Sequence, residues 1–147
     1  MVSQCGTLCD VTEERTHFSF RVDAPTRRRL REEARSRRVS ESELARRYVS
    51  EGVRLDRHPR ITFTEHVSGR RAALRSRPRL DVRYVVDTWR AHGKDEAATA
   101  AYHEIEPVDV RAALAYHREF SEEIDEESRR AQEDADRLEM EWLAERA

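Results

Sequence analysis

The pattern of apolar and polar positions predicts a mainly α-helical chain with one short strand near its start. In residues 16–22, THFSFRV, large apolar side chains at Phe18, Phe20 and Val22 alternate with polar side chains. This two-residue period indicates a strand with one buried and one exposed face. Almost all of the later sequence has helical spacing instead. The strand therefore needs a partner strand that the rest of the chain does not obviously supply.

Two helices are predicted directly after this strand. Pro25 is typical of a first helical turn, and Leu30 and Ala34 lie four residues apart, as one face of a helix requires. A second helix is expected to start at Ser40, where Glu43 three residues later completes a capping box. The buried face of this second helix is predicted to consist of Leu44, Tyr48, Val49 and Val53.

A second copy of the same chain is the simplest partner for the strand. Two copies pairing antiparallel about a twofold axis would place their apolar faces on the helices. The residues expected in this dimer core are Phe18, Phe20, Val22, Leu30, Leu44 and Tyr48. The other face would present His17, Ser19 and Arg21 of each chain. A two-stranded ribbon fits the DNA major groove, so these three residues are the predicted base-reading residues.

Phosphate contacts are expected beside this face. The free N–H groups at the start of the second helix would bind a DNA phosphate, and the arginines of the first helix would add salt-dependent attraction. The predicted phosphate-binding residues are Arg27, Ser40, Glu41 and Ser42. The competing interpretation makes the strand an edge strand of an ordinary mixed sheet, with residues 61–63 as its available partner, and the arginines a solvated face.

These residues resemble the ribbon-helix-helix repressors of the Arc, MetJ and CopG type. The resemblance covers about residues 15–56 and rests on the strand HFSFRVD, on Pro25, Leu30 and Ala34, and on the segment VSESELARRYV. It implies an obligate homodimer that binds operator DNA and represses transcription. The chain departs from the family at residues 37–39, where Arg-Arg-Val stands in place of the usual turn glycine.

Residues 57–120 are predicted to form a second, small module of three helices that is similar to a helix-turn-helix. Pro59 breaks the helical pattern, and a short strand is expected at residues 61–63. Gly93 is expected to end the first helix of the module, and Pro107 to begin the third. The inward positions of the first helix are Leu80, Val82, Val85, Val86 and Trp89, and those of the third are Val110, Leu114 and Phe120.

This module resembles a second family, the small antitoxin-associated domain of unknown function numbered four hundred and thirty-three. The matching residues, in order, are Arg79, Leu80, Val82, Gly93, Asp109, Val110, Ala112, Ala113, Leu114 and Tyr116. The glycine-containing signature at the front of that family is degraded here to GRRAALRSRPR. Together the two resemblances imply an antitoxin of the VapB type, whose partner is a PIN-like ribonuclease toxin encoded alongside.

Residues 121–147 are compatible with a helix but have a weak apolar face, whose middle is only alanine. An acidic segment of this kind suits folding onto a basic cleft, with toxin-binding residues expected at Leu138, Trp142 and Leu143. Deleting this segment is expected to abolish toxin neutralisation and to spare operator binding. Two alternatives are a solvated helix that extends the module and a segment that covers the basic head and competes with DNA.

Composition supports two small units rather than one large core, because charged residues make up 39% and apolar residues 37% of the chain. The net charge of -2 hides an asymmetry: residues 15–60 hold 14 arginines and 7 acidic residues, whereas residues 121–147 hold 4 and 11. No apolar run can span a bilayer and no signal peptide is recognisable, so a cytoplasmic protein is expected. Residues 1–14 are expected to be a disordered tail.

No catalytic residue, metal site or cofactor is predicted. The histidines have no metal-ligand spacing, Cys5 and Cys9 lack the further ligands of a zinc site, and four glycines leave little room for a phosphate-binding loop. Two alternatives to the antitoxin remain. One is a stand-alone ribbon-helix-helix repressor, for instance of plasmid copy number, without a toxin partner; the other is an adaptor whose strand only dimerises it.

Overall fold

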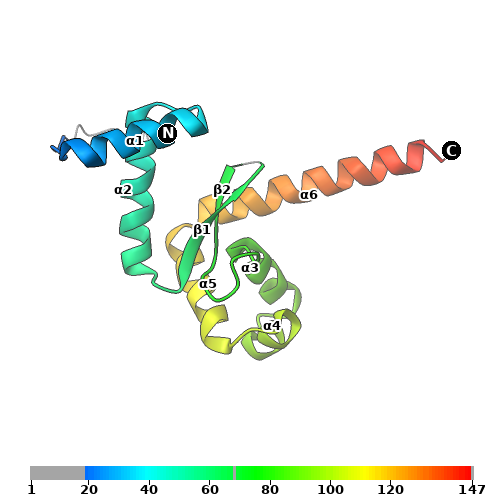
Figure 1. Ribbon diagram of the computed structural model, residues 1–147. Helices are drawn as coiled ribbons and strands as arrows, with labels where there is room; N and C mark the ends of the chain where they lie inside the picture. The colour runs from blue at the N-terminus through cyan, green and yellow to red at the C-terminus, as the bar shows by residue number, and fades with distance from the viewer. Residues whose placement is uncertain (1–18, 68, 147) are drawn as a thin grey trace, which may run out of the picture. The chain divides into compact units, whose positions relative to one another are not determined.

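The protein is described by a computed structural model that covers residues 19–67 and 69–146. In this part of the chain six helices and a two-stranded antiparallel sheet follow one another in the order α1, α2, β1, β2, α3, α4, α5 and α6 (Figure 1). The chain divides into two compact units, of which the first ends at Leu44 and the second begins at Ala45. The mainly helical class predicted from the sequence is therefore confirmed, and the predicted ribbon-helix-helix arrangement is not confirmed.

The first unit contains α1 (Ala24–Arg37) and the start of α2 (Glu41–Arg57). As predicted, Pro25 lies in the first turn of α1. Arg38 follows the helix as its C-cap with a left-handed φ of 57°, and the N–H of Val39 bonds back to the carbonyl of Ala34 at 3.0 Å. This is the conformation for which most helix ends use glycine. Arg38 thus adopts a left-handed conformation at the turn between α1 and α2.

The predicted N-cap of α2 is confirmed. The Ser40 hydroxyl oxygen accepts a hydrogen bond from the backbone N–H of Glu43 at 3.1 Å. This bond satisfies one of the N–H groups that a helix start leaves unpaired. Leu44 follows as the buried residue of α2, and Ala34 is the buried residue of α1.

The strand predicted at residues 16–22 is not formed by the described residues. His17 and Phe18 lie outside the described chain, and residues 19–23 precede α1 without belonging to a sheet. The physical reason is that a strand needs hydrogen bonds to a second strand. The only sheet in the described part of the chain pairs β1 with β2.

The second unit opens with a hairpin that the sequence revealed only in part. β1 (Ile61–His66) pairs antiparallel with β2 (Gly69–Leu74), with Ile61 opposite Leu74 and His66 opposite Gly69. The prediction of a single strand at residues 61–63 was too short and lacked its partner. Gly69 has a φ of 113°, which a residue with a side chain rarely adopts.

The helices of the second unit are α3 (Val82–Ala91), α4 (Glu96–His103), α5 (Pro107–Glu119) and α6 (Ser121–Ala144). The first three match the predicted module, including the turn at Gly93, which has a φ of 63°. α3 packs against α4, α5 and α6, and the hairpin contacts α3 and α5. The largest apolar side chains of the core are Ile61, Leu74, Val82, Val85, Val86, Val110, Tyr116 and Ile124.

The core extends into α6, contrary to the expectation that it ends at Ser121. Ile124 is fully buried in the same cluster as α3 and α5. Phe120 separates α5 from α6 and packs, partly buried, on that cluster. The first turns of α6 are therefore part of the module, and its C-terminal half runs beyond the other helices of this unit (Figure 1).

Candidate DNA-facing and partner-binding surfaces

Two of the three predicted base-reading residues can be placed. Ser19 and Arg21 are exposed, and His17 lies outside the described residues. Phe20 and Val22, which alternate with them, are also exposed, with 56% of Phe20 accessible. In the single chain this segment therefore shows both its polar and its apolar side chains to solvent.

The predicted phosphate-binding residues gather at the start of α2. Glu41 accepts a hydrogen bond from Arg31 Nε at 2.9 Å, and Arg27 Nε lies 3.7 Å from the same carboxylate. The hydrogen bond from Arg31 lowers the pKa of Glu41. An ionised carboxylate repels phosphate, so Glu41 can contribute only its backbone N–H there. Ser40 and Ser42 are exposed at this helix end.

The predicted dimer core is only partly buried in the single chain. Leu44 is buried and Leu30 half-buried, but Tyr48 is 41% and Val53 57% exposed. Val49, on the same helix, is exposed as well. The prediction places this face in the core of a dimer, and one chain by itself leaves most of it exposed. Apolar side chains exposed this close together on one helix face are typical of an interaction surface.

Arg54 ties the C-terminal half of α2 to α6. Its guanidinium donates hydrogen bonds to Glu123 at 2.8 Å and to the hydroxyl oxygen of Tyr116 at 2.9 Å, and lies 4.2 Å from the centroid of the Phe120 ring. Burial and the Glu123 charge raise the pKa of Tyr116 to about 12. The phenol is therefore neutral at physiological pH and acts as a structural hydrogen-bonding group.

A second polar connection holds α6 to α3 and α5. The Asp125 carboxylate lies 2.8 Å from Arg90 Nη2 and 2.9 Å from His117 Nε2. Burial would raise the pKa of Asp125, but the hydrogen bonds from Arg90 and His117 lower it overall. With Ile124 in the core between Glu123 and Asp125, the first two turns of α6 are anchored by both apolar and ionic contacts.

Glu127 lies one turn further along α6 and is half-buried beside a cluster of charged side chains. Its carboxyl has a buried oxygen without a hydrogen-bond partner among the described residues. Burial raises its pKa to about 7, helped by the charges of Glu123 and Asp81 and opposed by those of Arg71 and Arg83. Asp81, only 1% exposed, lies 3.5 Å from Arg71 and 3.2 Å from His66. The second unit therefore contains buried and half-buried ionisable groups that the hydrophobic periodicity of the sequence does not predict.

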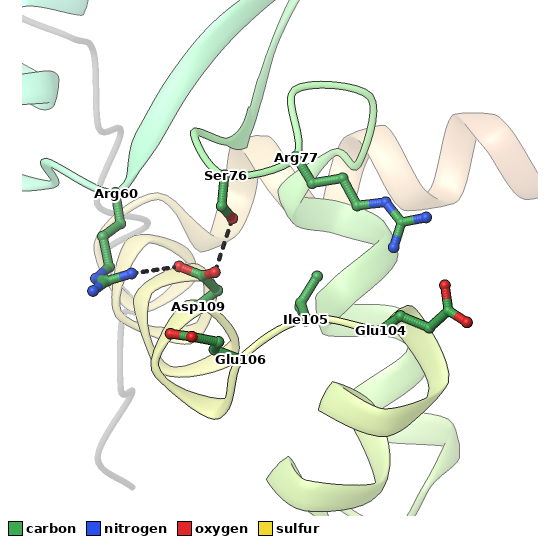
Figure 2. Close-up of a pocket in the computed structure, with 7 residues that line it drawn as sticks. All are labelled: Arg60, Ser76, Arg77, Glu104, Ile105, Glu106 and Asp109. Atoms are coloured by element: carbon green, nitrogen blue, oxygen red, sulfur yellow. Dashed lines mark hydrogen bonds and ion pairs between the residues drawn. The ribbon is translucent and has the colours of Figure 1, made fainter.

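Asp109 is a further buried carboxylate, and Figure 2 shows its surroundings. Its two oxygens accept hydrogen bonds from Arg60 and from the Ser76 hydroxyl, each at 2.8 Å. These bonds join the first turn of α5 to the start of β1 and to the loop after β2. The adjoining open pocket of about 620 Å³ is lined by Arg60, Ser76, Arg77, Glu104, Ile105, Glu106 and Asp109. Two arginines and three carboxylates line the pocket, so it has no strong preference for one sign of charge.

A local sequence pattern marks the two buried carboxylates, although the prediction did not use it. Asp81 lies between Leu80 and Val82, and Asp109 between Val108 and Val110. An acidic residue between two aliphatic residues at the start of a helix is a candidate for burial with a partner. Asp109 fits this pattern, since its hydrogen bonds with Arg60 and Ser76 give the buried carboxylate its partners.

The predicted toxin-binding residues lie on the exposed half of α6. Leu138, Trp142 and Leu143 are all exposed, with 51% of Trp142 accessible. Leu138 and Trp142 are four residues apart and share one face of the helix. The Arg146 guanidinium lies 4.0 Å from the centroid of the Trp142 ring. This half of α6 thus presents an apolar stripe on an acidic helix.

No group of three or more His, Cys, Asp or Glu residues suited to a metal ion occurs within residues 19–67 and 69–146. His103 accepts from or donates to the Thr88 hydroxyl at 2.9 Å, and burial lowers its pKa. Over the same ranges, none of the helices combines the length and the apolar character that crossing a bilayer requires.

Comparisons of the chain with known protein families, curated proteins and solved structures found no match.

Proposed function

We propose that the protein is the antitoxin of a type II toxin–antitoxin system. In this proposal it is a cytoplasmic homodimer whose N-terminal part binds operator DNA and represses its own operon. Its C-terminal part neutralises a PIN-like ribonuclease toxin. The two sequence resemblances suggest these roles, and three features of the described chain support them.

The observation that carries the proposal is the apolar surface left exposed by one chain. Phe20 and Val22 before α1, and Tyr48, Val49 and Val53 on α2, are exposed although their spacing is that of buried faces. Exposed apolar surface of this kind disfavours a monomer in water. Pairing with a second copy would cover it and would give the segment at residues 16–22 the partner strand that it needs.

Support for DNA binding comes from the charge and the helix end near this segment. Arg21, Arg28 and Arg29 are exposed, and none of them has a carboxylate within 4 Å among the described residues. Ser40 and Ser42 flank the N-terminus of α2, where backbone N–H groups favour a phosphate. A paired ribbon would then supply base contacts through Ser19 and Arg21.

Support for toxin binding comes from α6. Its exposed half, residues 132–146, holds six acidic residues and two arginines and carries the Leu138 and Trp142 stripe. A helix of this type fits an apolar groove with a basic rim, such as the cleft of an enzyme that binds RNA. Trp142 is the expected anchor, since buried aromatic residues dominate many interfaces.

The DNA-binding half of the proposal is tested by Arg21→Ala and Phe20→Asp. We expect Arg21→Ala to weaken specific operator binding in gel shifts while light scattering still shows a dimer. Phe20→Asp should abolish both, because it buries a charge in the dimer core. Arg129→Ala, which removes the same charge from α6, is the matched control and should bind normally. A wild-type monomer without DNA binding would end the proposal.

The toxin half is tested by co-expression with the product of the adjacent gene. The expected result is that the two proteins co-purify and that growth arrest by the partner is relieved. The second candidate function is a stand-alone ribbon-helix-helix repressor without a toxin. It is favoured if operator binding holds while no neighbouring gene encodes a toxic protein that binds the chain.

A further inference from the structure

The loop between β2 and α3 carries three exposed arginines, Arg75, Arg77 and Arg79. None of them has a carboxylate within 4 Å among the described residues. Elsewhere in the same unit arginines are neutralised, as Arg54 is by Glu123 at 2.8 Å and Arg70 by Glu51 at 2.7 Å. Three guanidiniums without a nearby carboxylate within five residues make this loop a concentrated positive site.

The loop is held in one conformation by its backbone. The N–H of Leu74 bonds to the carbonyl of Leu80 at 3.0 Å, and the N–H of Leu80 bonds to the carbonyl of Arg77 at 2.9 Å. The N–H of Arg75 also bonds to the carbonyl of Arg60 at 2.8 Å. A compact loop closed in this way presents its side chains at little entropic cost.

Two of the three guanidiniums are partly oriented without being neutralised. Arg75 donates to the carbonyl of Ile61 at 3.4 Å, and Arg77 donates to the carbonyl of His103. A guanidinium has five N–H donors, so each keeps donors for a ligand. Arginine also binds the oxygens of phosphate in a bidentate manner. The chemistry of the loop therefore fits phosphate groups.

The position of the loop points to the polymer that would carry these phosphates. Ser76 bonds to Asp109 in the first turn of α5, so the loop lies beside the start of that helix (Figure 2). Residues 104–106 join α4 to α5, with Glu104 at a φ of 53°. This is the connection length of a helix-turn-helix, whose second helix points its N-terminal end at a duplex.

We propose that Arg75, Arg77 and Arg79 form a second contact to duplex DNA, at the phosphate backbone beside the start of α5. The contact positions the duplex without reading its sequence, because Glu106 and Pro107 at the exposed helix start offer no side-chain donor to bases. The inference extends the proposed DNA-binding function to the second unit, and the contact itself does not require the ribbon.

Two neighbouring carboxylates make a local test possible. Glu104 and Glu106 line the same pocket as Arg77 and have exposed side chains. They would repel a phosphate that approaches Arg77. Replacing both with glutamine should therefore strengthen binding if phosphate sits here, and should have no effect on DNA bound only elsewhere.

The experiment measures the affinity of the full chain for a labelled duplex of arbitrary sequence by fluorescence anisotropy at several salt concentrations. We compare Arg75→Gln/Arg77→Gln/Arg79→Gln with Arg129→Gln/Arg130→Gln/Arg137→Gln, which removes the same charge from α6. The loop variant should lower the slope of log affinity against log salt by about 2 to 3, nearly 1 for each lost phosphate contact. The α6 variant should leave the slope as in the wild type, and Glu104→Gln/Glu106→Gln should raise the affinity.

Failure of this inference is distinguishable from failure of the proposed function. If the loop variant keeps the wild-type slope while Arg21→Ala loses operator binding, the loop contact is overturned and the ribbon stands. If instead the loop variant lowers the slope while Arg21→Ala keeps operator binding, the loop contact is supported and the ribbon contact is excluded. If the loop variant instead loses binding only to labelled polyglutamate, the partner is an acidic polypeptide and the inference is wrong. If the triple variant unfolds at a lower temperature than the wild type, Arg79→Gln alone decides the outcome, because the Arg79 side chain makes no hydrogen bond or ion pair with the described residues.

Discussion

At the scale of single residues, the ionisation of Glu127 should alter the stability of the second unit near neutral pH. Its pKa is raised to about 7 by burial and by Glu123 and Asp81, against the lowering effect of Arg71 and Arg83. A carboxyl whose pKa is higher in the folded than in the unfolded chain stabilises the fold while it is protonated. That contribution is complete below about pH 4.5 and is lost as the pH rises through about 7.

We therefore predict that Glu127→Gln gains stability over the wild type as the pH rises from 5 to 8. Thermal unfolding followed by circular dichroism across this range would measure the difference in midpoint. Glu126→Gln is the matched control, because hydrogen bonds from Arg129 and Arg130 lower the pKa of Glu126. Its stabilising contribution is lost only as the pH falls below about 4.5, so its difference should stay flat from pH 5 to 8. Equal profiles for the two variants would contradict the burial of Glu127.

At the level of elements, the sequence predicted those whose signals are local. Pro25, Ser40 and Gly93 marked helix boundaries because caps and turns depend on a few adjacent residues. The hairpin was only half predicted, since Ala72, Ala73 and Leu74 of β2 are all buried and show no alternation. Burial on both sides of a strand depends on helices distant in sequence.

The buried polar contacts were missed for a related reason. Glu127 is half-buried because α6 packs against α3, and this packing places it near the charges of Arg71, Asp81 and Arg83. The hydrophobic periodicity of the sequence predicts that charged side chains such as Glu127 lie on a solvent-exposed helix face. On α2 the difference runs the other way. The spacing of Tyr48, Val49 and Val53 predicts burial, but no described part of the single chain packs over these side chains.

A prediction at this scale concerns the α2 face. Tyr48 and Ser50 are both exposed in the single chain, on opposite sides of α2. Tyr48→Glu should weaken the homodimer by more than tenfold, since a charge would be buried against the second copy. Ser50→Glu adds the same charge on the other side and should leave the dimer intact. Analytical ultracentrifugation over a range of concentrations would measure both, and a Tyr48→Glu dimer of wild-type affinity would exclude this face from the interface.

For the whole molecule, the separation of charge gives the two ends different partners. The surplus of arginine in residues 15–60 suits a polyanion, and the acidic excess in residues 121–147 suits a basic protein. The structure changes how this division can be tested. Removing all of residues 121–147 would also take Ile124 out of the core and would remove Glu123 and Asp125, the partners of Arg54 and Arg90.

Truncation after Ala131 separates the two roles more cleanly. Residues 132–146 are exposed throughout, so their loss should leave the unfolding midpoint of the second unit nearly unchanged. We predict that this truncation abolishes toxin neutralisation in a growth assay and retains operator binding in gel shifts. A truncated chain that still neutralises the toxin would move the toxin contact to the second unit.

Point variants then locate the contact on α6. Leu138→Ala and Trp142→Ala should each weaken toxin binding, with the larger loss, about 2 kcal/mol or more, at the tryptophan if it is the anchor. Met140 is also exposed but lies on the side of the helix opposite Leu138 and Trp142, so Met140→Ala should cost less affinity than either of them. Isothermal titration calorimetry with the purified partner would rank the three. Equal losses at all three positions would mean that the helix is bound on every side, because a groove contacts only one face.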